Sequence, residues 1–594
     1  MPLNLAHLLN SAPVSPPRSQ PIRSTNNNGP EPSRLTELLS PTAISQSLAQ
    51  NPRSDDNDDQ EEKSNQKEPL QDVINEEVKN EEPNLNDQVG LASQTSQSAR
   101  PPRQSIGSIE VPPSCSDVPL VTTQDFLPMQ PATFTLPSAV FNGVFARGTQ
   151  IETPVYQRPI AMSSFSYLEG RRMAHGLRRY ESLKPINLGF NCIGFDLHTG
   201  IENVTYRDVT VDEGLDGLLT CLTHCLEHCP SADRPGLLRR LAETEFVTWR
   251  GMMTKICSAV YETSPAGGWE MNAMMVDGTI YIEENVSPAT IAAHVAESSN
   301  LIPSYYGHSY ESLMTSPPGR FNAVDTNVQW CSVVKANLNN IKLILGGEVD
   351  CVRPEAIQKV ETFPLRKFEV QPEDFIEIKT SGLITTERER WTFQRYKMLK
   401  FWLQSFLLGT PVINVGFRDK TGMVCKSESL STHEIPALVK HEADATARWS
   451  ASLCLDSGAK ILKFIKDQLQ PSRHHRLASF EAEFKRYCAI ETEKKLRYEP
   501  FEFSLSRWQR WPVFRIMFVP APQGGRRGGR GRIEIRELDY ELEVRKEVLA
   551  NRPPGGRVGF LPKQWIEHKI KQELALMEAQ LKHDQQAYPS QAPP

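Results

Sequence analysis

Two stretches of the sequence, KLILGGEVDCV (342–352) and FIEIKT (375–380), decide which fold the chain is expected to adopt. Both are apolar and rich in β-branched residues, a composition typical of strands. Residues two apart in a strand point to the same face. The polar residues at these alternating positions are Glu348, Asp350, Glu377 and Lys379. The two stretches therefore predict three carboxylates and one ammonium group on a single surface, with Ile376 and Ile378 turned toward a core.

Such a group of charges is unfavourable without a cation. Neighbouring carboxylates repel each other, and burial raises the pKa of each. A hard divalent ion such as Mg²⁺ or Mn²⁺ prefers oxygen ligands and relieves this repulsion. Asp350 is followed, after 26 residues, by Glu377-Ile-Lys379, a spacing that matches the P-D-(D/E)-x-K nuclease fold. The competing interpretation of these residues alone is a surface strand with ordinary salt bridges.

The segment that follows predicts a helix over residues 392–408, ended by Gly409. The helix is largely apolar but carries Lys400 and Gln404, which lie four residues apart and therefore on one face. A polar stripe on a buried helix needs a partner, and the predicted charged surface would provide one. The alternative is a solvated helix edge. Residues 412–417 then predict a buried strand.

Helix and strand patterns alternate from about residue 155 onward. Leucine spacing predicts a helix within 212–227, and MVDGTIYIE (275–283) predicts two strands around a turn at Asp277–Gly278. Residues 512–519 and 533–538 predict two more strands. We therefore expect an α/β (mixed α+β) fold, in which a mixed sheet is flanked by helices around a P-D-(D/E)-x-K nuclease-like core.

The composition divides the chain of 594 residues into three parts. Residues 1–130 are rich in Ser, Pro, Asn and acidic residues, and they predict a disordered region because they cannot bury enough apolar surface to fold. Residues 131–570 predict a single catalytic domain, and 571–594 a helix end with a polar tail. The first 100 residues carry 15 acidic and 8 basic residues, whereas the whole chain has a net charge of −6. The folded part is therefore nearly neutral, and any nucleic-acid contact must come from local basic patches.

Cysteine usage and hydropathy limit where the chain is expected to work. The 11 cysteines show no disulfide-like framework, which favours a reducing compartment, the nucleus or the cytoplasm. No run of about 18 uncharged apolar residues predicts a membrane span.

Several segments together resemble the DXO family of decapping nucleases, which includes the fungal Rai-type protein that partners the nuclear 5′→3′ exoribonuclease. The resemblance covers about residues 155–570. The segments that carry it are FVTWRG (246–251), GHSYE (307–311), Glu348-Val-Asp350, Glu377-Ile-Lys379, KMLKFWLQSFLLG (397–409) with Gln404, and VINVGFRD (412–419). Supporting stretches are GWEMNAMMVDGTIYIEEN (268–285) and GFLPKQWIE (559–567). The chain departs from the family at His308, where an aromatic residue such as Tyr is usual.

The resemblance implies a role for each site residue. The implied ligands of one or two divalent ions (Mg²⁺ or Mn²⁺) are Glu311, Glu348, Asp350, Glu377 and the backbone carbonyl of Ile378. Lys379 is implied to orient or deprotonate the attacking water, and Gln404 to position that water or the scissile phosphate. Arg250 is implied to pair with phosphate oxygens through its planar guanidinium. The implied catalytic residues are thus Lys379, Gln404, Glu348 and Asp350, and the implied substrate contacts are Arg250, Glu311, Lys379 and Gln404.

The implied function is hydrolysis at RNA 5′ ends in the nucleus, with the cytoplasm as the alternative. The implied reactions are pyrophosphate release from triphosphate ends, removal of incomplete caps and of nicotinamide-dinucleotide caps, and in some relatives 5′→3′ degradation. A different interpretation is an interaction protein that mainly stabilises or activates a 5′→3′ exoribonuclease. A third is a DNA nuclease that uses the same core.

Two further signals carry open alternatives. Cysteine and histidine alternate between Cys221 and Cys229, which suggests zinc, but one helix rarely supplies a complete structural zinc site, so a partly buried helix face is the favoured interpretation. The basic, glycine-rich segment 524–532 is either an RNA-gripping loop or a flexible hairpin insertion.

Overall fold

The computed structural model describes residues 2–4, 131–137, 154–187, 189–297, 302–317, 320–362, 369–494, 508–521 and 530–587. All of them fall in one compact unit, formed by Met1–Pro41 and Gln124–Pro594. Nearly all of the region 1–130 lies outside the described residues, as do most of the glycine-rich segment 524–532 and the tail 588–594. The division of the chain into three parts therefore remains a prediction.

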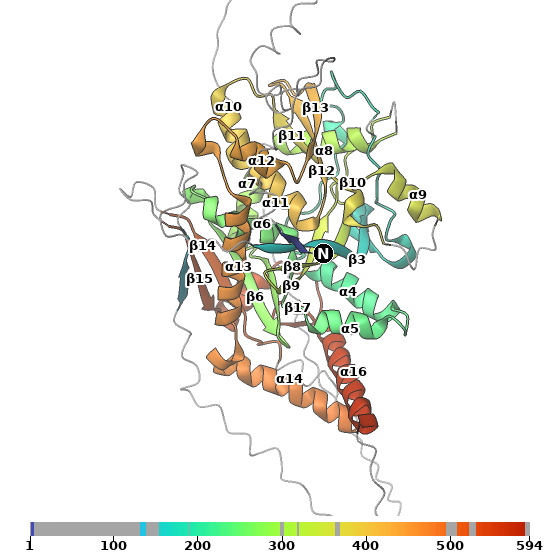
Figure 1. Cartoon of the computed structure of the whole chain (residues 1–594). Coiled ribbons are helices and arrows are strands. Elements are labelled where there is room, and N and C mark those ends of the chain that lie inside the picture. The colour runs from blue at the N-terminus through green and yellow to red at the C-terminus, as the bar shows by residue number, and fades with distance from the viewer. Residues whose placement is uncertain are drawn as a thin grey trace, which may run out of the picture. The chain divides into compact units, whose positions relative to one another are not determined.

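An eleven-stranded mixed sheet forms the centre of the fold (Figure 1). Its order is β1-β3-β8-β9-β5-β7-β6-β14-β15-β2, with β4 paired to β3. The strands are β1 (Pro2–Asn4), β2 (Ala132–Thr135), β3 (Val155–Leu168), β4 (Arg172–Ala174), β5 (Phe246–Trp249), β6 (Trp269–Val276), β7 (Thr279–Glu284), β8 (Gln329–Leu338), β9 (Ile341–Glu348), β14 (Phe514–Val519) and β15 (Arg532–Glu537). Strand β5 runs parallel to both β7 and β9, whereas the other pairs are antiparallel. The sheet is therefore mixed, as the sequence predicts.

A second, four-stranded sheet has the order β10-β11-β12-β13. Its strands are β10 (Cys351–Val352), β11 (Phe375–Gly382), β12 (Val412–Arg418) and β13 (Val424–Ser431). Strands β11 and β12 are parallel and are joined by a helical crossover. The crossover consists of α10 (Glu387–Thr392), the π-helix η10 (Phe393–Met398) and α11 (Leu399–Leu408). Because the two strands are parallel, the crossover runs antiparallel to β11 over its surface.

The remaining helices cover these sheets. They are α4 (Asp216–His228), α5 (Arg234–Ala242), α6 (Arg250–Ser258), α7 (Pro288–Glu297), α8 (Ile302–Thr315), α9 (Pro354–Thr362), α12 (Ile435–Lys440), α13 (Ala451–Gln468), α14 (His475–Lys494) and α16 (Lys563–Ala587). Helix α6 packs against both α11 and α13, and α8 packs on β11. Short pairs such as β16 (Arg557–Val558) with β17 (Leu561–Pro562) complete the unit. Among the described helices, none is long and apolar enough to cross a membrane.

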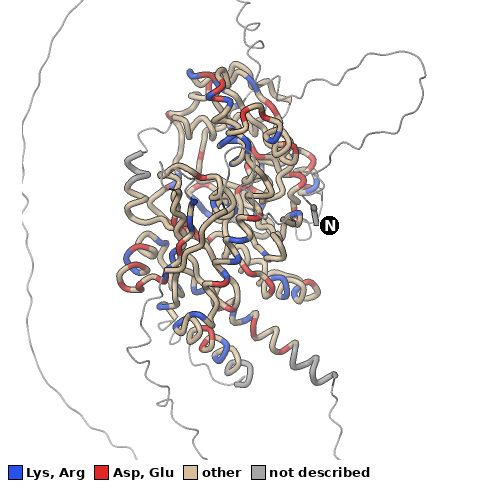
Figure 2. The backbone as a smooth tube through the Cα atoms, turned by 60° about the vertical axis from the view of Figure 1, so that its left-hand side comes forward, with Lys and Arg blue, Asp and Glu red and all other residues tan. Residues whose placement is uncertain are grey.

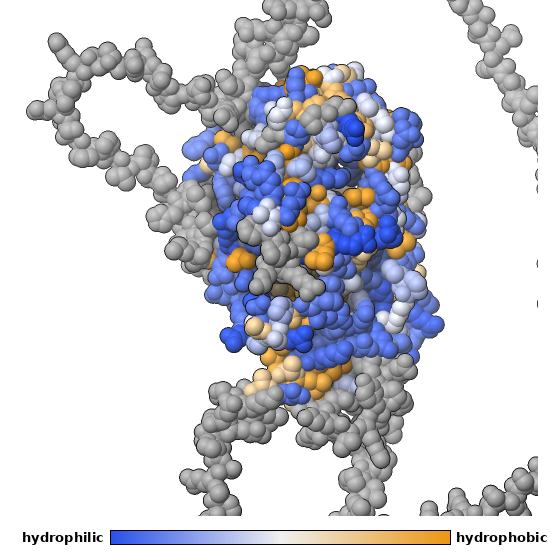
Figure 3. Space-filling view, turned by 90° about the vertical axis from the view of Figure 1, so that its right-hand side faces the viewer, coloured by the Kyte–Doolittle hydropathy of each residue, from blue (hydrophilic) through white to orange (hydrophobic). Residues whose placement is uncertain are grey.

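Apolar side chains gather in the interior of the unit. Phe246, Leu345 and Leu407 have exposures of 0%, and burying each contributes about 1.5–3 kcal/mol. The face shown in Figure 3 is mostly hydrophilic with small hydrophobic patches. Basic and acidic residues are interspersed along the described chain (Figure 2), which agrees with the nearly neutral charge expected for the folded part.

Local signals in the sequence position the crossover. The Thr386 side chain accepts a hydrogen bond from the Glu389 backbone, and the Glu389 side chain bonds back, so a capping box begins α10. Gly409 ends α11 with φ of 81°, as predicted. The helix is longer than the predicted 392–408, however, and its middle is a π-helix, which the sequence pattern did not indicate.

One expectation about the strands is wrong. The stretch 342–352 is not a single strand, because β9 ends at Glu348 in the large sheet and β10 begins at Cys351 in the small sheet. Between them, the Asp350 side chain accepts a hydrogen bond of 2.7 Å from the backbone N–H of Ile378. Glu348 and Asp350 therefore approach the same region from the junction of two sheets, and not from one face of one strand.

Candidate functional site

Arg250 and Glu348 meet at one edge of the large sheet. Arg250 begins α6 directly after β5, and Glu348 is the last residue of β9. Because β5 and β9 are parallel, their carboxyl ends lie side by side. The Nη2 atom of Arg250 lies 3.4 Å from the backbone oxygen of Glu348, and Nη1 lies 3.8 Å from Oε1 of Glu377. Arg250 is only 9% exposed, so its guanidinium is held in place among acidic groups.

Strand β11 contributes a lysine between two carboxylates. The Lys379 ammonium lies 2.7 Å from Oε1 of Glu377 and 3.4 Å from Oδ2 of Asp350. Glu377 and Lys379 share a face of β11, as predicted, while Ile376 and Ile378 are buried on the other side. The N–H and C=O of one residue in a strand point to the same edge. The carbonyl of Ile378 therefore faces the same edge as its N–H, where Asp350 lies.

Helix α8 brings a fourth carboxylate. Glu311 lies in the last turns of α8, which packs on β11. The His308 Nδ1 atom lies 3.6 Å from Oε2 of Glu311, and the charges of Glu311 and Glu348 raise the pKa of His308. The imidazole of His308 therefore lies beside the acidic group. This contact was not predicted, although the i, i+3 spacing of His308 and Glu311 in the sequence is a signal that could have identified it.

Burial and mutual repulsion dominate the electrostatics. Burial raises the pKa of Glu348, and the charge of Glu311 raises it further. Burial also raises the pKa of Asp350, although Lys379 opposes this. Burial acts to raise the pKa of Glu377 as well, but the charges of Lys379 and Arg250 together lower it. The pKa values of Asp350 and Glu377 shift in opposite directions, which agrees with the distances, since the Lys379 ammonium lies nearer to Glu377 than to Asp350.

The donor set suits a hard cation. If all four carboxylates were ionised, their charge would exceed that of the two cations, Lys379 and Arg250, by two, and the raised pKa values of Glu348 and Asp350 reflect this excess of acidic groups. The atoms that these four carboxylates offer as ligands are oxygens, the preference of Mg²⁺ and Mn²⁺. Within the described ranges, no three acid, imidazole or thiol groups are already arranged around one point. The position of Lys379 explains this, because its ammonium draws Glu377 and Asp350 to itself. The charge and chemistry of the site therefore fit a divalent ion, whose ligands would turn away from Lys379.

Helix α11 lines the same region. Lys400 is exposed, yet the surrounding protein and the positive charges of Lys379, Lys255 and Arg250 lower its pKa. Lys400 therefore lies within electrostatic range of the site, which supports the predicted polar stripe. Gln404 is half-buried one turn further along the helix. Lys255 on α6 also lies near the site, since its charge acts on Lys400. It was not predicted, although it lies only five residues after Arg250.

The structure thus brings together most of the site residues expected from the sequence. The group held by direct contacts consists of Arg250, Glu348, Asp350, Glu377 and Lys379. Glu311 joins it through its electrostatic effect on Glu348 and Asp350. Gln404 is assigned to the site only by its position on helix α11. The roles of these residues remain predictions.

The cysteine and histidine segment forms part of α4, as the favoured interpretation predicts. Cys221 is buried, with its Sγ 3.4 Å from Oγ of Ser163. The rings of His224 and His228 stack with centroids 4.0 Å apart, and His175 stacks on His224 at 5.2 Å. Stacked rings do not direct their nitrogens to a common point, and the described part of the chain holds no group arranged for zinc.

We expect acid to destabilise the fold through His175. Burial and the charge of His224 lower the pKa of His175 to about 4, whereas an unfolded histidine has a pKa of about 6.5. Between these pH values the unfolded state binds the extra proton, so the free energy of unfolding decreases as the pH falls. The contribution is at most about 3 kcal/mol, and solvent screening of the half-buried ring reduces it.

Urea unfolding of the wild type and of His175→Phe between pH 7 and pH 4 measures this contribution. Phenylalanine keeps the stacking surface and removes the titration, so the variant should lose part of the pH dependence. Equal pH dependence in both proteins would contradict the assignment.

Known proteins resemble this chain over most of its described residues. A family model described as "RAI1 like PD-(D/E)XK nuclease" matches residues 157–508. "Decapping nuclease RAI1" of Mycosarcoma maydis is 30% identical over 478 residues, covering 70% of this chain and 88% of the relative. "Decapping and exoribonuclease protein" of Homo sapiens is 35% identical over 323 residues, covering 52% and 75% of the two chains.

Two solved structures share the fold. Scheffersomyces stipitis Rai1 in complex with (3′-NADP)⁺ and calcium ion superposes with a TM-score of 0.52 at 17% identity, covering 75% of this chain and 99% of that one. Candida albicans Rai1 in complex with pU5-Mn²⁺ gives a TM-score of 0.51 at 17% identity, with coverage of 74% and 100%. The mixed α+β fold predicted from the sequence is thereby confirmed.

Proposed function

The chain belongs to the RAI1-like PD-(D/E)XK nuclease family, and from this premise we propose that it is a metal-dependent RNA decapping nuclease whose reaction centre is the acidic group around Lys379. One observation carries the proposal. Four carboxylates from α8, β9, the β9–β10 link and β11 gather at one edge, where Lys379 and Arg250 offset at most two of their charges. The charge that remains suits a divalent ion and, with it, a phosphate group.

Each site residue has a proposed role in the reaction. Glu311, Glu348, Asp350, Glu377 and the carbonyl of Ile378 would hold the ion. A divalent ion at such a site lowers the pKa of bound water and neutralises charge on the attacked phosphate. The Lys379 ammonium lies 2.7 Å from Glu377 and 3.4 Å from Asp350, so we propose that it orients the water or stabilises negative charge beside the ion. Deprotonation of the water by Lys379 is the alternative role.

Arg250 and Gln404 are placed to contact the phosphate. The planar guanidinium of Arg250 can donate two parallel hydrogen bonds to phosphate oxygens, and it is already oriented by the carbonyl of Glu348. Gln404 lies on the helix that faces β11 and can position the water or the scissile phosphate. Removing one such contact typically costs about 10²–10³ in rate.

The substrate is proposed to be an RNA 5′ end. The related Rai1 structures support this, since the Candida albicans protein is in complex with pU5-Mn²⁺ and the Scheffersomyces stipitis protein is in complex with (3′-NADP)⁺ and calcium ion. We propose that the chain removes incomplete caps and nicotinamide-dinucleotide caps and releases pyrophosphate from triphosphate ends. We also propose that digestion continues in the 5′→3′ direction after the first cut, because one relative is the "Decapping and exoribonuclease protein" of Homo sapiens.

A panel of substrates tests the proposal. Purified protein with Mg²⁺ or Mn²⁺ is expected to cut RNAs that carry a triphosphate, an unmethylated cap or a nicotinamide-dinucleotide cap faster than the same RNA with a complete methylated cap. Products resolved by chromatography identify the bond that is cut. DNA with the same 5′ ends is the control. Equal cutting of DNA would favour a general nuclease, and inert behaviour on every RNA would contradict the proposal.

The family resemblance also supports an interaction with a partner protein. We propose that the chain works in the nucleus beside a 5′→3′ exoribonuclease and stabilises it, in addition to its own catalysis. Co-purification from nuclear extract with an active exoribonuclease would support this role. If the inactive Glu348→Ala, Asp350→Ala variant fully replaced the wild type in cells, the binding role would be the main one.

A further inference from the structure

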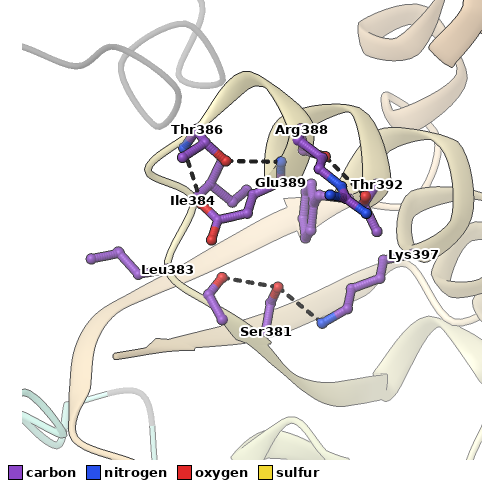
Figure 4. A pocket seen from close by; sticks show the side chains of 10 residues that line it. Ser381, Leu383, Ile384, Thr386, Arg388, Glu389, Thr392 and Lys397 are labelled. Atoms are coloured by element: carbon purple, nitrogen blue, oxygen red, sulfur yellow. Dashed lines mark hydrogen bonds between the residues drawn. The ribbon is translucent and has the colours of Figure 1, made fainter. Parts of the chain in front are cut away.

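A pocket of about 420 Å³ lies at the carboxyl end of β11, just beyond the catalytic lysine (Figure 4). We call it the downstream pocket. The lining residues used below are Ser381, Leu383, Ile384, Arg388, Phe393 and Lys397. They come from the end of β11 and from the first part of the crossover helix, α10 and η10.

The downstream pocket and the reaction centre share one strand face. Ser381 is two residues beyond Lys379, so both side chains point to the same side of β11, about 7 Å apart along the strand. The Lys397 ammonium donates a hydrogen bond of 3.1 Å to Oγ of Ser381. One helical turn further along the antiparallel crossover, Lys400 lies within the field of Lys379. Ser381 and Lys397 therefore place polar and basic groups at the pocket, on the strand face that carries Lys379.

The pocket combines an anion site with apolar walls. Arg388 and Lys397 provide the positive charge. Glu389, the acidic member of the lining, is already engaged, because it accepts hydrogen bonds of 2.8 Å and 3.0 Å from the backbones of Thr385 and Thr386.

The walls are formed by Leu383, Ile384 and Phe393. A flat apolar group with an attached anion fits such a lining, and a nucleotide has both parts. Single-stranded nucleic acids are typically held in this manner, by cations along the phosphates and by apolar or aromatic contacts with the bases.

The π-helix is a second, independent observation. Segment η10 (Phe393–Met398) interrupts an otherwise regular α-helix and supplies both Phe393 and Lys397 to the pocket. Helical insertions of this kind occur frequently at functional sites. Here the insertion allows one continuous helix to direct residues at both the pocket and the reaction centre, where Lys400 and Gln404 lie.

We propose that the downstream pocket binds a nucleotide of the RNA strand on the 3′ side of the hydrolysed linkage. The inference rests on the proposed function and extends it to the body of the substrate. Arg388 and Thr386 at the pocket are exposed to solvent, so a strand that enters from the reaction centre can leave again, as a polymer requires. The phosphate pairs with Arg388 and Lys397, and the base lies against Phe393 and Leu383.

The test compares two substrates with the same cap. One is a cap joined to a single nucleotide, which has no strand beyond it, and the other is the same cap on an octanucleotide. The variant Arg388→Ala, Lys397→Gln removes both cations, and glutamine can keep the hydrogen bond to Ser381. The control variant Arg510→Ala, Arg545→Ala removes two exposed cations that pair with Glu541 elsewhere.

The pocket variant is expected to raise KM for the octanucleotide about tenfold, without changing kcat or the hydrolysis of the short substrate. Fluorescence anisotropy with the octanucleotide should show the same loss of affinity, because phosphate contacts carry much of the binding. The control variant should match the wild type in both measurements.

Two results would overturn the inference. An unchanged KM for the octanucleotide would show that the strand does not use the pocket, and an equal loss on the short substrate would place the cap there instead. If the proposed function itself were wrong, the wild type would cut neither substrate, which distinguishes that outcome from the two above.

Discussion

Replacing Glu348 and Asp350 together by alanine is expected to reduce RNA 5′-end hydrolysis by at least about 10³-fold while leaving the chain folded. Each carboxylate is a proposed ligand of the ion, and the loss of one electrostatic contact of this kind already costs about 10²–10³ in rate. The two effects need not multiply, because residues that act as a unit are not additive.

The fold should tolerate this change. Burial raises the pKa of both carboxylates, and the charge of Glu311 adds to this effect, so their removal relieves an unfavourable burial of charge in the folded state. One loss is the hydrogen bond from the Ile378 backbone to Asp350, and leaving that N–H unpaired costs about 1–3 kcal/mol. The other is the contact of Asp350 with Lys379, whose ammonium keeps its nearer partner, Glu377. Circular dichroism and urea unfolding should therefore show a native-like protein.

A matched control uses an acid away from the site. Glu387 lies at the start of α10, and its side chain is 83% exposed, so Glu387→Ala should hydrolyse RNA like the wild type. If the double variant retained activity in saturating Mg²⁺ or Mn²⁺, the metal assignment would be wrong.

Replacing Lys379 by methionine is expected to have the second largest effect, a loss of about 10²–10³ in kcat. The ammonium now neutralises Glu377 and Asp350 at 2.7 Å and 3.4 Å. Without it, the carboxylates repel one another, and removing one partner of a buried ion pair typically costs about 3–5 kcal/mol. Without added metal, the variant should therefore unfold at lower urea concentration than the wild type.

Metal should reverse part of this loss of stability. A divalent ion can replace the missing positive charge, so Mn²⁺ is expected to stabilise Lys379→Met more than it stabilises the wild type. Activity should not return, because the group beside the water is gone. Lys379→Arg separates the two roles, since it keeps the charge but changes the geometry of the donor. Full activity of the methionine variant would contradict the role given to Lys379.

Local sequence patterns were sufficient for part of the fold. Alternation in FIEIKT correctly placed Glu377 and Lys379 on one face and the isoleucines in a core. The Asp277–Gly278 turn joins β6 to β7 as expected, with positive φ at both residues. These features depend on a few neighbouring residues, and the sequence therefore contains enough information to predict them.

Features set by distant segments could not be predicted in this manner. The break between β9 and β10 lies where the chain passes from one sheet to the other, and there Asp350 bonds to the backbone of Ile378, 28 residues away. Glu311 could be included only through the family resemblance, since no spacing relates α8 to β11. The downstream pocket was not anticipated at all, because it depends on the π-helix and on the contact between Lys397 and Ser381.

The central claim is that the acidic group around Lys379 holds a divalent ion at the point where RNA is cut. Crystals soaked in Mn²⁺ and measured with anomalous scattering test it most directly. We predict an anomalous peak ligated by carboxylates from Glu311, Glu348, Asp350 and Glu377, with Lys379 turned away from at least one of them. A peak elsewhere, or none at this site when Mn²⁺ supports full activity, would contradict the account.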